Sequence, residues 1–461
     1  MNPAISAQSG SLMWLANKPA LGRGERKMSA LSKNTPGALE TARLIAAGQL
    51  TATQAVQQRL EIVKDLEPNL KAWVSIHESE AIEAAQMIDS MPVSGKIHGV
   101  PIAIKDIFAV KGMPWHCGSE LWKGRTAEFD AGSVALARRA GGIVLGKTET
   151  TEFAFYQPTR TRNPHDLSRT PGGSSSGSAA AVASGMVPLA FGTQTSGSII
   201  RPASFCGIVG FKPSFDLIET GGVAPLSRSL DTVGVFARSV PDASLLVEAL
   251  TGLNLQPDAS ANPTKLPVYR SPVWDQAEPE LVSAWSAFEE GLAAKFSVHK
   301  FAPEIELALA EAPDLHARIM AAEAAEALAY EYAEGPETLS EALRAELEKG
   351  SAISADERLR DRQAMRSLRH LVEGLVPRNA VWLTPSSTGP APLFETGTGS
   401  PSFNRIWSLL GLPCCSVPLL QTHDGLPMGV QVVGAMGNDG GVLTVADWLM
   451  ARFGQCWSQQ N

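Results

Sequence analysis

Two loops rich in glycine and serine, joined by a short run of small residues, constrain this chain more than any other feature. The first loop covers residues 172–178 and the second covers residues 192–198. Residues 179–185 between them have the composition of a tightly packed helix that ends at a glycine. Glycine lets backbone N–H groups approach a ligand, and serine hydroxyls can attack or relay protons. The paired loops therefore predict a site for acyl transfer.

The composition of the chain is that of a globular protein with a sizeable core. The sequence has 461 residues, of which 44% are hydrophobic and 19% are charged. A formal net charge of −8 argues against a general nucleic-acid binder, which needs a basic face. No apolar run reaches the length of about 18 residues that a membrane span requires. We therefore expect neither nucleic acid nor a membrane as a partner.

The cysteines and the N-terminus bear on location and domain limits. The five cysteines are scattered and lack metal-like spacing: Cys117, Cys206, Cys414, Cys415 and Cys456. They predict buried thiols in a reducing cytoplasm rather than disulfides. Residues 1–30 show neither periodicity nor the features of a secretion signal. We expect a disordered N-terminal extension there, followed by a single domain over 31–461.

Hydrophobic periodicity predicts an α/β core in the first half of the chain. Helices are expected at 39–47, 52–66 and 133–140, and strands at 99–106 and 143–145. The alternation of strand and helix continues to about residue 210. This order indicates a mixed sheet flanked by helices.

The second half of the chain divides into a helical segment and a return to strands. Residues 257–377 are rich in Ala, Glu and Leu, which predicts a variable helical cap or insertion. Strand-like sequence resumes at 380–384, 415–418 and 428–433.

Residues 141–148 match the phosphate-binding pattern G-x-x-x-x-G-K-[ST] letter for letter. That loop must follow a strand and expose its inner backbone to phosphates. Here the inner residues are Ile143, Val144 and Leu145, and the preceding segment is helical in pattern. We expect a buried strand and an accidental match.

Residues 173–177 match G-x-S-x-G, the nucleophile elbow of α/β-hydrolases, with Ser175 as the nucleophile. That mechanism needs a downstream acid and histidine, for which His370 and His423 are candidates. The HGGG-type oxyanion segment is missing. An esterase that uses Ser175 stays an alternative.

Lys105 follows the apolar residues 102–104 near the end of the predicted strand 99–106 and is a candidate general base. A lysine acts as a base only when neutral, and burial lowers its pKa because desolvation disfavours the charged form. The alternative is a lysine whose stem is buried while its ammonium reaches solvent or pairs with Asp106. The residues alone leave both interpretations open.

Together these segments closely resemble the amidase signature family. The core of the resemblance is 173–183, 192–199 and 202–207, and it extends to 99–106, 146–148, 210–213, 229–234 and 425–431. It covers roughly residues 39–449 and is weakest across the helical segment. It implies an amidase-signature fold, in which helices and a helical insertion flank a central mixed β-sheet.

The resemblance also implies a Ser–Ser–Lys triad. Ser198 would be the nucleophile that forms the acyl-enzyme, and Ser174 the bridging serine, which follows a cis peptide bond in the family. Lys105 would be the base that drives proton transfer through Ser174. Ser175 would then have no catalytic role.

The second loop resembles the oxyanion hole of the family, which is built from backbone N–H groups. Its members here would be Thr195, Ser196 and Gly197. Ser196 stands where many relatives have glycine. Because the donors belong to the backbone, we expect this difference to matter only if the Ser196 side chain alters the turn.

Two substrate-binding residues are expected. Many relatives read G-S-I-R-x-P-A, whereas in this chain Arg201 is shifted by one position and Gln194 replaces an aspartate. Both features resemble the malonamidase-like branch, where this arginine binds a substrate carboxylate. The alternative is a structural arginine that ties the loop to neighbouring carbonyls. Tyr156 lies in a variable segment and is expected either in an aryl-binding wall or in the core.

The sequence thus predicts a cytoplasmic amidase that hydrolyses a linear carboxylic amide to an acid and ammonia or an amine. The expected partner is a small-molecule amide, with no metal or cofactor, and the assembly considered is a homodimer. An alternative within the same fold is an amidotransferase subunit that passes ammonia to a misacylated tRNA. A non-catalytic scaffold is a third class.

Overall fold

The computed structural model describes residues 35–263, 265–293 and 303–454. The predicted N-terminal extension, residues 1–30, lies outside the described residues, as does Cys456.

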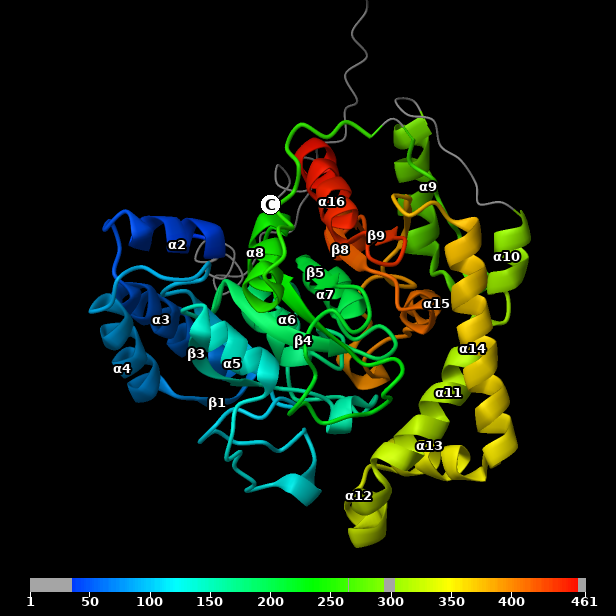
Figure 1. Cartoon of the computed structure of the whole chain (residues 1–461), viewed down its shortest axis with the longest axis horizontal. Coiled ribbons are helices and arrows are strands. Elements are labelled where there is room, and N and C mark those ends of the chain that lie inside the picture. The colour runs from blue at the N-terminus through cyan, green and yellow to red at the C-terminus, as the bar shows by residue number, and fades with distance from the viewer. Residues whose placement is uncertain (1–34, 264, 294–302, 455–461) are drawn as a thin grey trace, which may run out of the picture.

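A nine-stranded sheet with the order β1-β3-β2-β4-β6-β5-β8-β9-β7 forms the centre of the molecule (Figure 1). β2 runs parallel to β3 and β4, and the other neighbours pair antiparallel. The predicted mixed sheet is therefore confirmed. The strands are β1 (Trp73–Ile76), β2 (Pro101–Lys105), β3 (Ile143–Thr148), β4 (Leu189–Gln194), β5 (Val209–Lys212), β6 (Thr232–Ala237), β7 (Val381–Pro385), β8 (Cys414–Gln421) and β9 (Pro427–Gly434).

Helices flank the sheet and build a separate group on one side. The α-helices of the described residues are α2 (Ala38–Ala46), α3 (Ala52–Leu70), α4 (Glu78–Asp89), α5 (Gly132–Arg139), α6 (Ser176–Ala183), α7 (Ile200–Cys206), α8 (Val240–Thr251), α9 (Pro279–Ala293), α10 (Pro303–Leu309), α11 (Ala312–Ala327), α12 (Ala329–Glu334), α13 (Glu341–Ala352), α14 (Ala355–Leu375), α15 (Ser402–Leu410) and α16 (Asp439–Phe453). In Figure 1, α10 to α14 gather on the side opposite α2, α3 and α4.

Alternate residues of the central strands enter different apolar clusters, as the period of two in a strand requires. In β2, Ile102 and Ile104 belong to one cluster, and Ala103 belongs to the other, which also contains residues of α3, α4 and α6. Both faces of the sheet are therefore buried, which accounts for the nearly continuous apolar sequence of these strands.

Helix α6, which joins the two glycine/serine loops, consists of small residues because it is packed against the sheet and the neighbouring chain. Its residues Ala179, Ala180, Ala181 and Val182 are fully buried. Gly177 in its first turn has no room for a side chain, since an added Cβ would overlap the carbonyl oxygen of Ala72. The close packing holds both loops against the strand ends.

Two predicted boundaries differ from the structure. Helix α3 continues to Leu70 instead of ending near residue 66, and it includes Pro68. Within the predicted helical segment 257–377, no α-helix precedes Pro279 among the described residues. The prolines at 257, 263, 267 and 272 explain the late start, because proline lacks the N–H of a helical turn.

The segment that matches a phosphate-binding loop forms the buried strand β3, as expected. Its lysine, Lys147, is fully buried and donates hydrogen bonds to Asp106 Oδ1 at 2.7 Å and to the carbonyls of Phe108 and Pro114. The ammonium group is thus occupied within the core. Separately, no helix in the described ranges has the length and apolar character needed to cross a membrane.

Candidate active site

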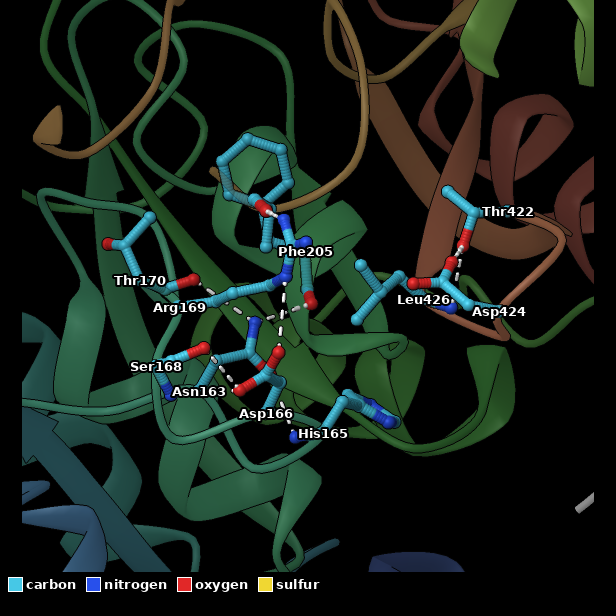
Figure 2. Close-up of polar contacts among 11 residues, drawn as sticks. Asn163, His165, Asp166, Ser168, Arg169, Thr170, Phe205, Thr422, Asp424 and Leu426 are labelled. Atoms are coloured by element: carbon cyan, nitrogen blue, oxygen red, sulfur yellow. Dashed lines mark hydrogen bonds and ion pairs between the residues drawn. The ribbon is translucent and has the colours of Figure 1, made fainter. Parts of the chain in front are cut away.

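The first glycine/serine loop is held in place by the segment before it. Asn163 Nδ2 donates to the carbonyl of Thr170 at 3.1 Å and to that of Phe205 at 2.9 Å (Figure 2). Phe205 belongs to α7, so Asn163 ties the approach to the loop to the helix that carries Arg201. The peptide bond between Gly173 and Ser174 is cis.

Lys105, the last residue of β2, reaches this loop through the protein interior. Its side chain is fully buried, and Nζ donates to Ser174 Oγ at 2.7 Å and to Thr193 Oγ1 at 2.8 Å. The ammonium group does not reach solvent, and Asp106 is paired with Lys147 instead. The sequence left open whether the Lys105 ammonium is buried or reaches solvent, and in the structure it is buried.

Burial also changes the charge of Lys105. Desolvation lowers its pKa from 10.5 to about 7, while the carboxylate of Asp231 opposes the shift. A substantial fraction of the amine is then neutral near pH 7. At the same distance of 2.7 Å, a neutral amine can accept the proton of the Ser174 hydroxyl.

Ser198 and Ser174 line the same small cavity. Ser198 lies between β4 and α7 and is 8% exposed. The cavity has a volume of about 10 Å³, which is room for roughly one water molecule. Its walls are Thr151, Ala154, Phe155, Tyr156, Ser174, Thr195, Ser196, Ser198, Arg201, Leu226, Met320 and Thr398.

In the second loop, the carbonyls of residues 195–197 are occupied, whereas two of the N–H groups are free. The carbonyls of Thr195, Ser196 and Gly197 accept bonds from His316 Nε2, Ser408 Oγ and the Arg201 N–H respectively. Within the described residues, the N–H groups of Ser196 and Gly197 have no hydrogen-bond acceptor. Free backbone donors beside a serine hydroxyl are the arrangement that stabilises an oxyanion.

Side chains from distant elements hold this loop. Asp231 Oδ1 accepts a hydrogen bond from Thr195 Oγ1 at 2.5 Å. Gln194 Oε1 accepts hydrogen bonds from the backbone N–H groups of Ile199 and Ile200. Ser196, at the position where many relatives have glycine, directs its hydroxyl to Met320 Sδ at 3.3 Å.

His316, from the helical segment, is a residue that sequence reasoning missed. It is fully buried, and burial lowers its pKa to about 3, so the imidazole is neutral. Because the Thr195 carbonyl can only accept, the proton of this imidazole is on Nε2. No local pattern in α11 signals this contact. Asp231, in contrast, lies within 229–234, a segment that carries part of the family resemblance.

Arg201 has the structural role that the sequence left as one of two alternatives, and it also keeps two donors free. Its Nη2 donates to the carbonyl of Gly173 at 2.6 Å, which ties the first loop to α7. Its Nε and Nη1 are buried without a partner in the described structure, as are Tyr156 Oη and Thr151 Oγ1. All three residues line the cavity of Ser198. Buried donors without partners are costly, so the cavity is suited to an anionic group that accepts from them.

The alternative nucleophile Ser175 does not face this cavity. It is fully buried, and its hydroxyl donates to the Thr193 carbonyl at 3.3 Å. Its candidate partners His370 and His423 are both exposed. The structure therefore does not assemble the site that an α/β-hydrolase mechanism needs.

The residues that line the cavity of Ser198 include no Cys, His, Asp or Glu. No cluster of His, Cys, Asp or Glu suited to a metal ion occurs within 35–263, 265–293 and 303–454. Cys117, Cys206, Cys414 and Cys415 are buried free thiols. Ala154, Phe155 and Tyr156 line the cavity together with Met320 of the helical segment. Trp407 is instead buried beside Tyr269 and Trp382.

Comparison with known proteins gives consistent matches. The family model described as Amidase matches residues 51–443. A glutamyl-tRNA(Gln) amidotransferase subunit from Chromohalobacter salexigens is 37% identical over 59% of this chain and 56% of its own length. The protein of the same name from Chlamydia pneumoniae is 30% identical over 87% and 92% respectively. In several of these curated relatives the match spans about half of their length.

A solved structure titled "Crystal structure of amidase" superposes with a TM-score of 0.82 at 32% identity. It covers 91% of this chain and 100% of that chain.

Proposed function

The chain belongs to the amidase signature family, and on this premise we propose that it hydrolyses the amide of a small carboxylated substrate through an acyl-enzyme on Ser198. One observation carries the proposal. The cavity of Ser198 is also lined by Ser174, which contacts Lys105, and by Arg201, whose guanidinium has free donors.

The first half of the reaction forms the acyl-enzyme. Ser198 Oγ attacks the amide carbonyl carbon while its proton passes to Ser174, whose own proton moves to the neutral Lys105 amine. The oxygen of the tetrahedral intermediate becomes negative and accepts bonds from the loop N–H groups. Each such donor typically contributes about 2.7–4 kcal/mol to the transition state. The C–N bond then breaks as the proton returns from Lys105 through Ser174 to the leaving nitrogen.

The second half releases the acid. Water attacks the acyl carbon and gives a proton to the same relay. The ester bond to Ser198 breaks, and the proton returns to Ser198 Oγ. The products are a carboxylic acid and ammonia or an amine, which then exchange a proton in water, so the atoms balance without a further reactant.

Arg201 and Tyr156 supply the proposed substrate preference. A substrate carboxylate can accept from a free donor of Arg201, Nε or Nη1, and from Tyr156 Oη. Burial without a carboxylate partner lowers the pKa of Arg201 to about 10, still well above neutral, so the guanidinium remains charged. Binding an anion there satisfies donors that are otherwise buried and unpaired.

A second candidate function is supported by the curated relatives, which carry the name of an amidotransferase subunit. In that function an amide donor such as glutamine is hydrolysed by the same residues, and the ammonia passes to a tRNA-bound substrate on partner subunits. Glutamine also carries a carboxylate. The names of the curated relatives, one of which matches over 92% of its own length, favour this candidate, whereas the superposition on a solved amidase favours the first.

Ammonia release by the purified chain tests both candidates. Malonamate, glutamine and a neutral aryl amide are compared in the wild type, Ser198→Ala and Arg201→Gln. We expect turnover of a carboxylated amide that Ser198→Ala abolishes, and a raised KM in Arg201→Gln. Glutamine turnover that requires a co-purifying partner supports the amidotransferase. Normal turnover by Ser198→Ala refutes the mechanism.

A further inference from the structure

A second cavity, much larger than that of Ser198, lies beside it. Its volume is about 440 Å³, within the range of small-molecule sites. Its lining residues are Tyr156, Phe205, Glu278, Thr388, Pro392, Thr396, Gly397, Thr398, Gly399 and Ser400. Tyr156 and Thr398 line both cavities. These two side chains therefore stand between the reacting serine and the larger space.

The two cavities differ in size, so they can hold different parts of the substrate. The inner cavity, of about 10 Å³, has space for little more than one water molecule. A larger substrate needs further space, and the outer cavity, which shares Tyr156 and Thr398 with the inner one, adjoins it.

Glu278 is the one charged residue among those that line the outer cavity. Its carboxylate makes no hydrogen bond or ion pair within the described residues. Its backbone N–H donates to the Thr388 carbonyl at 2.7 Å, and its carboxyl group lies directly against Gly389. The main chain thus places the carboxyl group at the wall of the cavity.

The charged groups around Glu278 leave its negative charge unpaired. Burial and the neighbouring Glu280 raise the pKa of Glu278, and only Arg169 opposes them. Arg169 is already engaged, with Nε on Asp166 Oδ2 at 3.2 Å and Nη1 on the Ala391 carbonyl at 2.6 Å. Figure 2 shows the contact of Arg169 with Asp166.

We propose that the outer cavity binds the distal end of the substrate and that Glu278 selects substrates whose distal end carries an ammonium group. The inference rests on the proposed function and names the substrate class for it. The class is an amide with a carboxylate near the reacting carbonyl and a cation several bonds away. The aromatic rings of Tyr156 and Phe205 and the hydroxyls of the wall also suit a cation.

The proposed selection for an ammonium group can be tested with pairs of substrates that differ only in their terminal group. N-(5-aminopentyl)malonamate and N-hexylmalonamate differ by an ammonium in place of a methyl group. The pair 6-aminohexanamide and heptanamide lacks the carboxylate and places the same difference on the acyl side, so it tests the outer cavity without a contribution from Arg201. We expect wild-type kcat/KM to favour the ammonium member of a pair by about threefold to fivefold, the size of a partly exposed ion pair. The preference should decrease as salt is raised.

Variants of Glu278 test whether the preference depends on the charge of its side chain. Glu278→Gln should abolish the preference for the ammonium member, and Glu278→Lys should reverse it. Glu280→Gln is the matched control, because Glu280 is exposed, as Glu278 is, but does not line the cavity. It should keep the wild-type ratio.

Two results overturn the inference without touching the proposed function. One is an equal rate for both members of each pair in the wild type, and the other is a preference that survives Glu278→Lys. If no substrate is turned over, calorimetric binding of the malonamate pair to Ser198→Ala tests the subsite alone. Equal affinity for both members in that protein also overturns it.

Discussion

Lys105 Nζ lies 2.7 Å from Ser174 Oγ, although the two residues are 69 positions apart in the chain. The contact exists because β2 ends at the loop that begins α6, with both elements buried in the same core. It brings the candidate base to a serine that shares a cavity with Ser198. Activity should therefore depend on the contact between Lys105 and Ser174 and on the second glycine/serine loop, which contains Ser198.

Replacement of Lys105 by methionine should remove the base while filling the same buried space. We expect kcat to fall by about 10²–10⁴-fold, the usual contribution of a general base. Thr193→Val is the control, since it removes the other hydroxyl that contacts Lys105 Nζ and should cost less. Steady-state ammonia release measures both. A Lys105→Met protein within a fewfold of wild type contradicts the assignment.

The activity should rise with pH through neutrality. Because burial lowers the pKa of Lys105 to about 7, the amine is protonated and inactive below that value and neutral above it. The profile of kcat/KM should therefore increase through about pH 7 and level off above it. Asp231→Asn removes a negative charge that raises this pKa, so its midpoint should move to lower pH. A profile with the same midpoint in both proteins counts against Lys105 as the titrating base.

His316 should act as a positioning residue for the oxyanion loop. Loss of its bond to the Thr195 carbonyl in His316→Ala should lower kcat by about tenfold, less than the roughly 10²–10³-fold loss from deleting an oxyanion donor. His316→Gln retains an N–H donor and should restore part of the rate, with KM little changed in both variants. An equal loss in Ala and Gln variants, or a loss confined to KM, indicates a purely structural role.

Ser175→Ala should retain turnover, because its hydroxyl bonds to the Thr193 carbonyl and faces away from the cavity. A small loss of stability is expected from the buried bond, of about 0.5–1.5 kcal/mol. Rate and denaturant unfolding are measured on the same protein beside Ser198→Ala. Loss of activity in Ser175→Ala with activity kept in Ser198→Ala restores the esterase alternative.

The buried pair of Lys147 and Asp106 should be important for stability rather than for chemistry. Asp106→Ala leaves the buried ammonium of Lys147 without its carboxylate and should reduce the free energy of unfolding by about 3–5 kcal/mol. Glu40→Gln breaks the exposed pair with Arg43 and serves as the control, with little expected change. Urea unfolding followed by circular dichroism compares the two. Similar stabilities for both variants contradict the prediction.

Local sequence patterns are sufficient to predict most helices and strands of the fold. The strands β2, β3, β8 and β9 and the small helix α6 were predicted near their observed positions because their patterns depend on residues a few positions apart. The family resemblance added the candidate triad, which no periodicity signals. The late start of the helices after residue 257 was missed, although its prolines were visible in the sequence.

The sequence by itself determined which residues carry competent chemistry: two serines, a lysine at a strand end and an arginine after the second loop. The tertiary structure alone decided that Lys105 is buried against Ser174, that His316 holds the Thr195 carbonyl, and that Arg201 keeps free donors. The physical reason is that secondary structure follows from neighbours along the chain. Burial, pKa and unused hydrogen-bond donors depend instead on groups that folding brings together from tens to hundreds of residues away.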